Sequence, residues 1–295
     1  MRILPWAFVF CFAFACSSPD QPEAAGGGND GADAGTMQPT PDAGTTTMQP
    51  TCVPGSTCLE QGENSFVNGN DTRAITVLLP AQAQGAPVVF AWHYLTGSRA
   101  ELIAWMELQR LADAGYRVVV PASRALADTE WDVVGAPERN VDVALFDALL
   151  DAVTAQYNVD RTRIYATGFS AGGLFTTYLT MYRAQVLRAT APFSGGVPQG
   201  AYAPPATELP VMISWGGTSD VLYGFDFNDA ANNFARSLTA DGHAVALCNH
   251  GQGHWLPSDA LPHVLAFFGD HAADPATAWS VAPARIPSGC TAAPQ

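Results

Sequence analysis

The sequence contains no lysine. All 13 basic residues in the 295-residue chain are arginines, against 27 acidic residues. A Walker-type phosphate loop, a Schiff-base lysine and a Ser-x-x-Lys hydrolase each need a lysine, so these three kinds of site are excluded. The net charge of −14 would repel nucleic acid and anionic lipid surfaces, and no cluster of arginines offsets it locally. We therefore expect no nucleic-acid partner and a substrate of little or no charge.

A hydrophobic run long enough to span a bilayer is also lacking. Residues 1–16, MRILPWAFVFCFAFAC, have one basic residue, Arg2, and a short apolar stretch, which together predict an export signal. Two processing patterns fit its end. The sequence AFA before Cys16 suits ordinary signal-peptide cleavage and secretion, whereas Ala15-Cys16 followed by two serines resembles a bacterial lipobox. We prefer the second pattern, in which Cys16 carries a lipid that anchors the protein at a bacterial cell envelope and is its only link to a membrane.

Residues 17–51 are poor in large apolar side chains. They consist mostly of Gly, Ala, Asp, Thr and Pro, and the sequence DAGTMQPT from Asp33 nearly repeats as DAGTTTMQPT from Asp42. Such a segment buries too little apolar area to offset its chain entropy, which predicts a disordered acidic tether. A dispensable low-complexity tail is an equally good interpretation. Residues 52–295 then form one domain, long enough to bury a sizeable core.

Cysteines are few once the export signal is set aside. Four remain, at Cys52, Cys58, Cys248 and Cys290, and in an exported protein they imply two disulfides with three connectivities. Cys52 and Cys58 enclose a short turn, so we predict the pairs Cys52–Cys58 and Cys248–Cys290. The second pair would tether the C-terminal tail to the segment around residue 248.

From residue 73 onward, the hydrophobic period switches repeatedly between that of strands and that of helices. This alternation, with nearly continuous apolar strands, predicts an α/β fold with a mostly parallel central sheet and helices on both faces. Ligands of such sheets bind at the carboxyl ends of the strands. The expected strands are residues 75–80, 86–93, 116–123, 162–169, 188–194, 209–217 and 244–248, and the expected helices are 98–115, 138–157, 171–183, 227–238 and 258–270.

One serine stands among small residues where a strand should turn into a helix. The segment GFSAG around Ser170 matches the G-x-S-x-G nucleophile elbow, although a glycine-rich connection without chemistry has the same pattern. As a nucleophile, Ser170 would need two backbone donors for the oxyanion. We expect these from Ala171, directly after the serine, and from Tyr94, in the loop after the strand that ends near His93. His93 itself precedes the serine in the chain, and we expect it to hydrogen-bond the loop.

A hydroxyl nucleophile needs a base and an acid that orients the base, in the chain order Ser, Asp, His. Asp220 follows the glycine turn of SWGGTSD and is the expected acid, with a turn-capping role as the alternative and Asp226 and Asp229 in reserve. The loop NHGQGHWLP offers two histidines. We expect His254 to be the base, because flanking glycines let the chain curl back toward the sheet, and His250 to be structural.

Three tryptophans lie in or beside the expected active-edge loops. Trp131, Trp215 and Trp255 could form a substrate-binding aromatic wall for an acyl group or polymer, or could simply pack in the core. A zinc site at Cys248, His250 and His254 is a further alternative, but no other cluster completes four ligands. We therefore expect neither a metal nor an organic cofactor.

The segments VDRTRIYATGFSAGG, SWGGTSD and GQGHWLP occur in this order and resemble the extracellular polyhydroxybutyrate depolymerase and feruloyl esterase group of α/β-hydrolases, over about residues 73–270. The resemblance implies an α/β-hydrolase domain and a serine carboxylic-ester hydrolase that acts through an acyl-enzyme. It assigns Ser170 as nucleophile, Asp220 as acid and His254 as base. One departure is His93-Tyr94, where the group commonly has His-Gly, so that a bulkier side chain must occupy or cover the pocket.

An ester substrate, polymeric esters included, is thus the expected partner. Two other functions fit parts of the sequence. One is a serine peptidase of the prolyl-oligopeptidase-like group, which shares the triad and the fold. The other is a catalytically silent surface lipoprotein that binds a polymer. Neither the natural acyl group nor the oligomeric state follows from the sequence.

Overall fold

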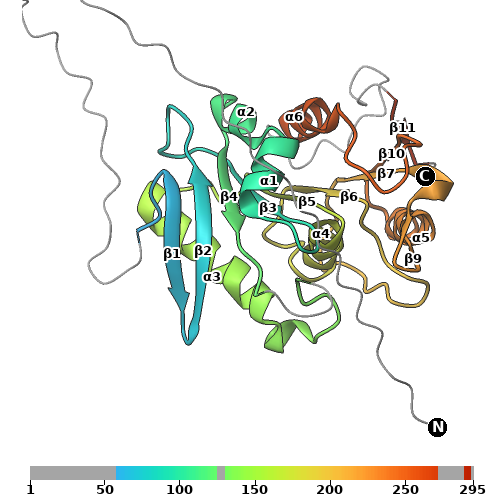
Figure 1. The fold of residues 1–295 in the computed structure, drawn as a ribbon, viewed down its shortest axis with the longest axis horizontal. Helices are drawn as coiled ribbons and strands as arrows, with labels where there is room; N and C mark the ends of the chain where they lie inside the picture. The colour runs from blue at the N-terminus through green and yellow to red at the C-terminus, as the bar shows by residue number, and fades with distance from the viewer. Residues whose placement is uncertain (1–57, 125–129, 272–288, 294–295) are drawn as a thin grey trace, which may run out of the picture. The chain divides into compact units, whose positions relative to one another are not determined.

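The computed structural model describes residues 58–124, 130–271 and 289–293 (Figure 1). The expected export signal and tether, with Cys16 and Cys52, lie outside the described residues. None of the described helices is both long and apolar enough to cross a membrane.

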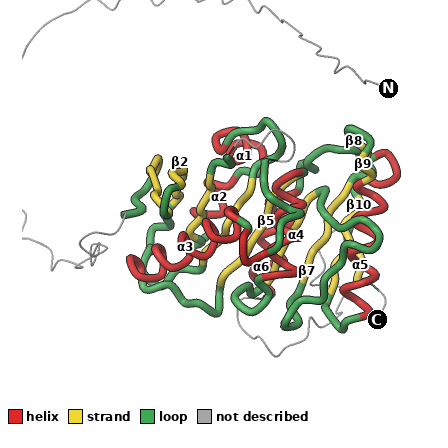
Figure 2. The backbone as a smooth tube through the Cα atoms, turned by 90° about the horizontal axis from the view of Figure 1, so that it is seen from below, coloured by secondary structure: helices red, strands yellow, loops and turns green. Residues whose placement is uncertain are grey.

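A nine-stranded sheet forms the centre of the domain, and Figure 2 shows its strands side by side with helices packed along them. Its six inner strands run parallel, whereas the strands at the two edges pair antiparallel. The expected mostly parallel sheet is therefore confirmed. Its order is β1 (Gly62–Asn68), β2 (Asp71–Leu78), β4 (Arg117–Pro121), β3 (Val88–Trp92), β5 (Ile164–Phe169), β6 (Ala189–Phe193), β7 (Val211–Trp215), β10 (Val245–Asn249) and β11 (Thr291–Ala292).

Helices cover both faces of this sheet. Along β3, Val88, Phe90 and Trp92 pack into the cluster under α3, α4 and α5, whereas Val89 and Ala91 pack into the cluster under α1, α2 and α6. Because successive side chains of a strand point to opposite faces, a strand buried on both faces must be apolar throughout. The helices are α1 (Arg99–Trp105), α2 (Leu108–Asp113), α3 (Val141–Tyr157), α4 (Ala171–Tyr182), α5 (Phe227–Ala240) and α6 (Ala260–Asp270), with short 3₁₀ turns η1 (Pro137–Arg139) and η2 (Gly217–Ser219).

Several elements differ from the expectations, among them one helix and the first strand of the sheet. The single helix expected at 98–115 is broken into α1 and α2, because Glu107 adopts a left-handed backbone conformation with φ of 50°. Strand β1 was not expected. It joins β2 through a tight turn with Gly69 at a φ of 61°, and its one fully buried side chain is Phe66, so its apolar pattern is weak.

The strand register brings several carboxyl ends to one edge of the sheet. Phe169 of β5 pairs with Phe193 of β6, which pairs with Ser214 of β7, which pairs in turn with Cys248 of β10. The segments that follow these strands therefore begin next to one another. They carry the serine, the aspartate and the histidine that the sequence analysis singled out.

A disulfide between Cys248 and Cys290 joins β10 to the chain end, and β11 pairs with β10 beside it. Cys58 is also disulfide-bonded. The pairing of Cys58 with Cys52 stays a prediction, because Cys52 lies outside the described residues.

Replacing Cys248 and Cys290 together by serine should lower the free energy of unfolding. The two residues are 42 positions apart, and in the chain-entropy model a closed loop of that length stabilises the folded state by about 4 kcal/mol. Urea denaturation of the wild type and the double variant measures the difference. An unchanged denaturation midpoint would contradict this prediction, because the disulfide would then not restrict the conformations of the unfolded chain.

Candidate active site

Ser170, His254 and Asp220 are joined by two short hydrogen bonds. The Ser170 Oγ lies 2.8 Å from His254 Nε2, and His254 Nδ1 lies 2.6 Å from Asp220 Oδ1. Asp220 is fully buried, and the Ser170 side chain is nearly so. With Nδ1–H facing the carboxylate, Nε2 is the acceptor for the serine proton. Chemically, this arrangement can draw a proton from the hydroxyl and hold the resulting imidazolium against a buried carboxylate.

Ser170 sits at a strained turn between β5 and α4. Its backbone has a φ of 57° and a ψ of −117°, outside the regions that L-residues favour. The turn is held by the Ser170 N–H, which donates to the Phe193 carbonyl at 3.0 Å. A Cβ added to Gly172 would lie 1.9 Å from the Trp92 carbonyl oxygen, so only glycine permits this close approach of helix and strand.

The Asp220 carboxylate is fixed by two further donors. Its Oδ2 accepts hydrogen bonds from the Ser194 hydroxyl and from the Gly216 N–H, each at 2.8 Å, which leaves Oδ1 to His254. The bond from Gly216 is the turn-capping contact that the sequence analysis considered as the alternative role of Asp220. The same carboxylate therefore caps the turn and pairs with His254. Sequence analysis missed Ser194, although SGG directly after a buried strand was an available signal.

The comparisons with known proteins concern most of this domain. A model of the dienelactone hydrolase family matches residues 74–255, more than half of the chain. The chain belongs to the dienelactone hydrolase family.

Relatives of this family member include named esterases. It is 27% identical over 179 residues to a probable feruloyl esterase C of Aspergillus terreus, covering 58% of this chain and 63% of the relative. It is 30% identical over 152 residues to a bifunctional acetylxylan esterase/xylanase of Neocallimastix patriciarum, covering 51% of this chain and 22% of the relative. The chain thus spans less than two thirds of the length of these relatives.

Solved structures share the fold of this dienelactone hydrolase family member. Native sOPH superposes with a TM-score of 0.68 at 19% identity, over 83% of this chain and 97% of that one. A carboxylesterase of Bacillus cereus superposes with a TM-score of 0.55 at 17% identity, over 68% of this chain and 96% of that one. The expected α/β-hydrolase fold is confirmed.

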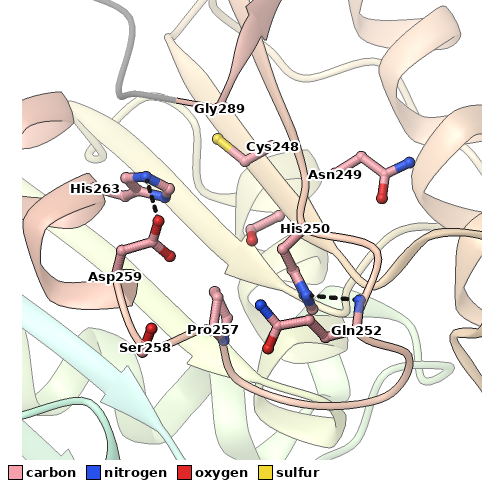
Figure 3. Close-up of a pocket in the computed structure, with 10 residues that line it drawn as sticks. Cys248, Asn249, His250, Gln252, Pro257, Ser258, Asp259, His263 and Gly289 are labelled. Atoms are coloured by element: carbon pink, nitrogen blue, oxygen red, sulfur yellow. Dashed lines mark hydrogen bonds and ion pairs between the residues drawn. The ribbon is translucent and has the colours of Figure 1, made fainter.

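His250 lies apart from Ser170 in this family member. Its Nδ1 accepts a hydrogen bond from the Gln252 N–H at 3.3 Å, and it lines a separate polar cavity of about 290 Å³ together with Asp259 and His263 (Figure 3). Burial lowers the pKa of His250, and the nearby carboxylates of Asp220 and Asp259 oppose that shift. The zinc site considered as an alternative loses its cysteine ligand, because the sulfur of Cys248 is bonded in the disulfide.

Of the two reserve aspartates, Asp226 caps α5. Its Oδ1 accepts a hydrogen bond from the N–H of Asp229, which lies in the first turn of that helix, at 2.9 Å. Of Asp220, Asp226 and Asp229, only Asp220 has a carboxylate oxygen hydrogen-bonded to His254.

His93 is buried and fastens two loops, in line with the structural role expected for it. Its Nε2 accepts from the Ser123 N–H at 3.1 Å, and its Nδ1 lies 3.0 Å from the Tyr94 carbonyl. Desolvation lowers the pKa of His93, in keeping with a ring whose Nε2 acts as an acceptor. The Tyr94 ring stacks on Trp105 at a centroid distance of 5.0 Å, and the next residue, Leu95, lines the cavity beside Ser170.

An apolar cavity of about 180 Å³ opens beside Ser170. It is smaller than the pockets that take drug-sized ligands, so it fits a short acyl chain or a single ring. Part of its wall is a hairpin, β8 (Val221–Leu222) and β9 (Phe225–Asp226), directly after Asp220. No charged side chain lines this cavity. Apart from Ser170, its lining residues are Leu95, Ala171, Leu174, Leu222, Tyr223, Phe225 and Phe227. Of these, the sequence analysis singled out only Ala171.

Two of the three tryptophans do not form the aromatic wall considered for them and pack in the core instead, which was the alternative. Trp131 is fully buried, where its ring packs edge-on against Trp92 and its Nε1–H donates to the His93 carbonyl at 2.8 Å. Trp215 is 5% exposed, and its Nε1–H donates to Asn228 Oδ1. Both indole groups are buried because they pack in the core cluster between the sheet and helices α4 and α5. Trp255 is different, being 61% exposed.

Gly216→Ala should destabilise this family member, because an added Cβ would lie 1.7 Å from the Gly253 carbonyl oxygen. The Gly253 N–H donates to the Gly216 carbonyl at 2.9 Å, so the two loops that carry Asp220 and His254 touch here. We expect the free energy of unfolding to fall by about 2 kcal/mol or more.

The matched control is Gly269→Ala in α6, where a Cβ meets nothing within 4 Å. It should leave stability unchanged or raise it by about 0.5–1 kcal/mol, as alanine does in helices. Equal denaturation midpoints for the two variants would contradict the close contact at Gly216.

Proposed function

We propose that this chain is a serine carboxylic-ester hydrolase that uses Ser170, His254 and Asp220 and works through an acyl-enzyme. The observation that carries the proposal is the unbroken series of hydrogen bonds from the Ser170 hydroxyl through the imidazole to the buried carboxylate. A strained elbow that presents the serine, and an apolar cavity against it, support the same conclusion. A polymer-binding protein without catalysis has no physical need for all three features.

In the proposed reaction, Ser170 Oγ attacks the ester carbonyl while its proton passes to His254 Nε2. The carbonyl oxygen gains negative charge, and the backbone N–H groups of Ala171 and Tyr94 are proposed to stabilise it. As the tetrahedral intermediate collapses, the leaving alcohol takes the proton from His254. Water then attacks the acyl-enzyme with the same histidine as base. The bond between Ser170 Oγ and the acyl carbon breaks, the carboxylic acid leaves, and His254 returns the proton to Ser170 Oγ, while Asp220 stabilises each imidazolium.

The acyl group is proposed to occupy the apolar cavity next to Ser170. Its size of about 180 Å³ and its lining without charge favour an uncharged short-chain or single-ring acyl group, such as a feruloyl group or one hydroxyalkanoate unit of a polyester. The relatives named as feruloyl and acetylxylan esterases support an ester substrate of this size.

Export is part of the proposal. The apolar segment at residues 1–16 and the disulfide between Cys248 and Cys290 both fit an oxidising compartment outside the cytosol. Lipid attachment at Cys16, with residues 17–51 as a tether, is the preferred form, and ordinary secretion is the alternative.

A fluorophosphonate probe tests the proposed nucleophile directly. The wild type should be labelled and should release p-nitrophenol from short acyl esters, whereas Ser170→Ala should show neither reaction and an unchanged melting temperature. A panel of feruloyl, acetyl and hydroxybutyrate esters, with peptide amides beside them, then identifies the bond. Cleavage of amides in preference to esters would point to a peptidase, and absence of both reactions to a binding protein.

The two loop histidines make a matched pair for the base. His254→Ala should reduce ester turnover by about 10⁴-fold or more, as removal of a triad member does. His250→Ala should cost less than about tenfold, because its ring faces the Gln252 N–H and the other cavity. Steady-state kinetics on one ester compares them. If His250→Ala were the inactive variant, the proposed base would be wrong.

Ser194 is proposed as a positioning residue that acts through Asp220. Loss of a hydrogen bond to a charged group costs about 1.5–3 kcal/mol, so Ser194→Ala should lower kcat by roughly tenfold to a hundredfold and leave KM within about twofold.

Ser194→Gly separates the hydroxyl from the backbone. Ser194 has a φ of 43°, which glycine adopts without strain, and both variants lack the hydroxyl. The two should therefore lose the same kcat. Wild-type kcat in the glycine variant would assign the effect to backbone strain instead.

A further inference from the structure

Two phenyl rings pack against the imidazole of His254, and the proposed mechanism uses neither of them. The ring centroid of Phe227 is 4.3 Å from that of the imidazole, with the two planes 35° apart. The ring centroid of Phe169 is 5.2 Å from it, with the planes 29° apart. Both phenylalanines are 4% exposed, so these contacts are shielded from water. We call Phe169 and Phe227 the phenyl pair.

The hydrogen bonds of the imidazole leave one motion free. Its two nitrogens are tied to Ser170 and Asp220, but the ring can still rotate about the line through those nitrogens. The N–H and lone-pair directions lie in the ring plane, so such a rotation turns them away from their partners and weakens both hydrogen bonds. A ring packed at a shallow angle to the imidazole opposes this rotation. The phenyl pair is therefore placed to keep the base aligned.

The two rings reach His254 from different elements, each next to another member of the proposed triad. Phe169 is the last residue of β5 and directly precedes Ser170. Phe227 is the first residue of α5, and its N–H donates to the Asp220 carbonyl at 2.9 Å. The hairpin of β8 and β9 connects Asp220 to Phe227. The backbone that places the acid therefore also places the ring beside the base.

Phe227 has a second contact, with the proposed acyl cavity. It lines that cavity together with Phe225, whose ring meets it edge-on at a centroid distance of 4.7 Å. Leu174 lines the same cavity from α4, whereas Phe169 is not among its lining residues. Phe227 is thus a wall shared by the acyl cavity and the base, and Phe169 packs on the base alone of these two.

We propose that Phe169 and Phe227 are positioning residues that keep the His254 imidazole aligned, and that Phe227 also limits the length of the acyl group. This inference rests on the proposed ester hydrolase function and adds residues that control its rate and its acyl selection. Loss of a positioning residue lowers the aligned fraction of the base, which lowers kcat and leaves KM nearly unchanged. Loss of a wall residue changes the ratio of kcat/KM between acyl chains instead.

Leucine substitutions remove each ring and keep an apolar side chain. Phe169→Leu should lower kcat for p-nitrophenyl butyrate and p-nitrophenyl hexanoate alike by roughly threefold to tenfold, the range for one aromatic contact, with KM within about twofold. Phe227→Leu should lower kcat for the butyrate by a similar factor. It should also raise the hexanoate-to-butyrate ratio of kcat/KM by roughly threefold or more, because the smaller side chain enlarges the cavity. Steady-state kinetics on both esters measures these changes.

Two control variants separate the roles. Phe268 is a fully buried phenylalanine of α6 whose ring stacks on Tyr165 at a centroid distance of 4.6 Å. Phe268→Leu should lower the melting temperature but keep kcat within about twofold. Leu174→Ala should raise the hexanoate-to-butyrate ratio, as Phe227→Leu does, because it enlarges the same cavity.

Equal losses of kcat in Phe169→Leu and Phe268→Leu would overturn the positioning role, because the loss would then follow from general destabilisation. An unchanged hexanoate-to-butyrate ratio in Phe227→Leu would overturn its role as the wall of the acyl cavity.

Proton NMR of the resting protein keeps the inference separate from the proposed function. The proton between His254 Nδ1 and Asp220 Oδ1, which are 2.6 Å apart, should resonate far downfield, and His254→Ala should remove that signal. The signal should broaden in Phe169→Leu and Phe227→Leu, where the imidazole can rotate, and stay sharp in Phe268→Leu. This pattern in a protein that hydrolyses no ester would support the phenyl pair and reject the hydrolase. A sharp signal with wild-type kcat in Phe169→Leu would reject the phenyl pair and leave the ester hydrolase proposal standing.

Discussion

The buried carboxylate of Asp220 is the point at which three loops of this domain meet. It accepts hydrogen bonds from the Ser194 hydroxyl after β6 and from the Gly216 N–H after β7, and it pairs with His254 from the loop after β10. An isolated carboxylate without solvent would be costly, so each donor stabilises the charge as well as the geometry. Because all three segments leave the same edge of a parallel sheet, one ionised group can order them together.

Close backbone approach is the second condition for the site. The elbow at Ser170 packs against β3 with Gly172 next to the Trp92 carbonyl, and the Asp220 turn packs against the histidine loop with Gly216 next to the Gly253 carbonyl. In both places a methyl group would separate the elements by more than the hydrogen bonds of the site tolerate. The glycines that look like loop punctuation in the sequence therefore set distances between reactive side chains.

The surroundings of Ser170 divide into two regions of unlike chemistry. A small uncharged cavity lies on the hairpin side, with Leu174 and Phe227 in its wall, whereas the exposed indole groups of Trp105 and Trp255 lie on the α1 side. The cavity limits the size of a proposed acyl group.

The sequence by itself determined the layers of the fold and the three residues that the structure joins, whereas the tertiary structure decided what surrounds them. Strand and helix periods, the G-x-S-x-G turn at Ser170 and the glycine turn before Asp220 are local patterns, and local sterics and hydrogen bonding impose their conformations wherever they occur. Burial is not local. Trp131 and Trp255 both stand in segments expected to be loops, yet one is enclosed by the helices of the sheet face and the other is exposed, because only the packed elements define an inside. For the same reason Ser194 could not be linked to Asp220 before the strands had a register, since 26 residues separate the two in the chain.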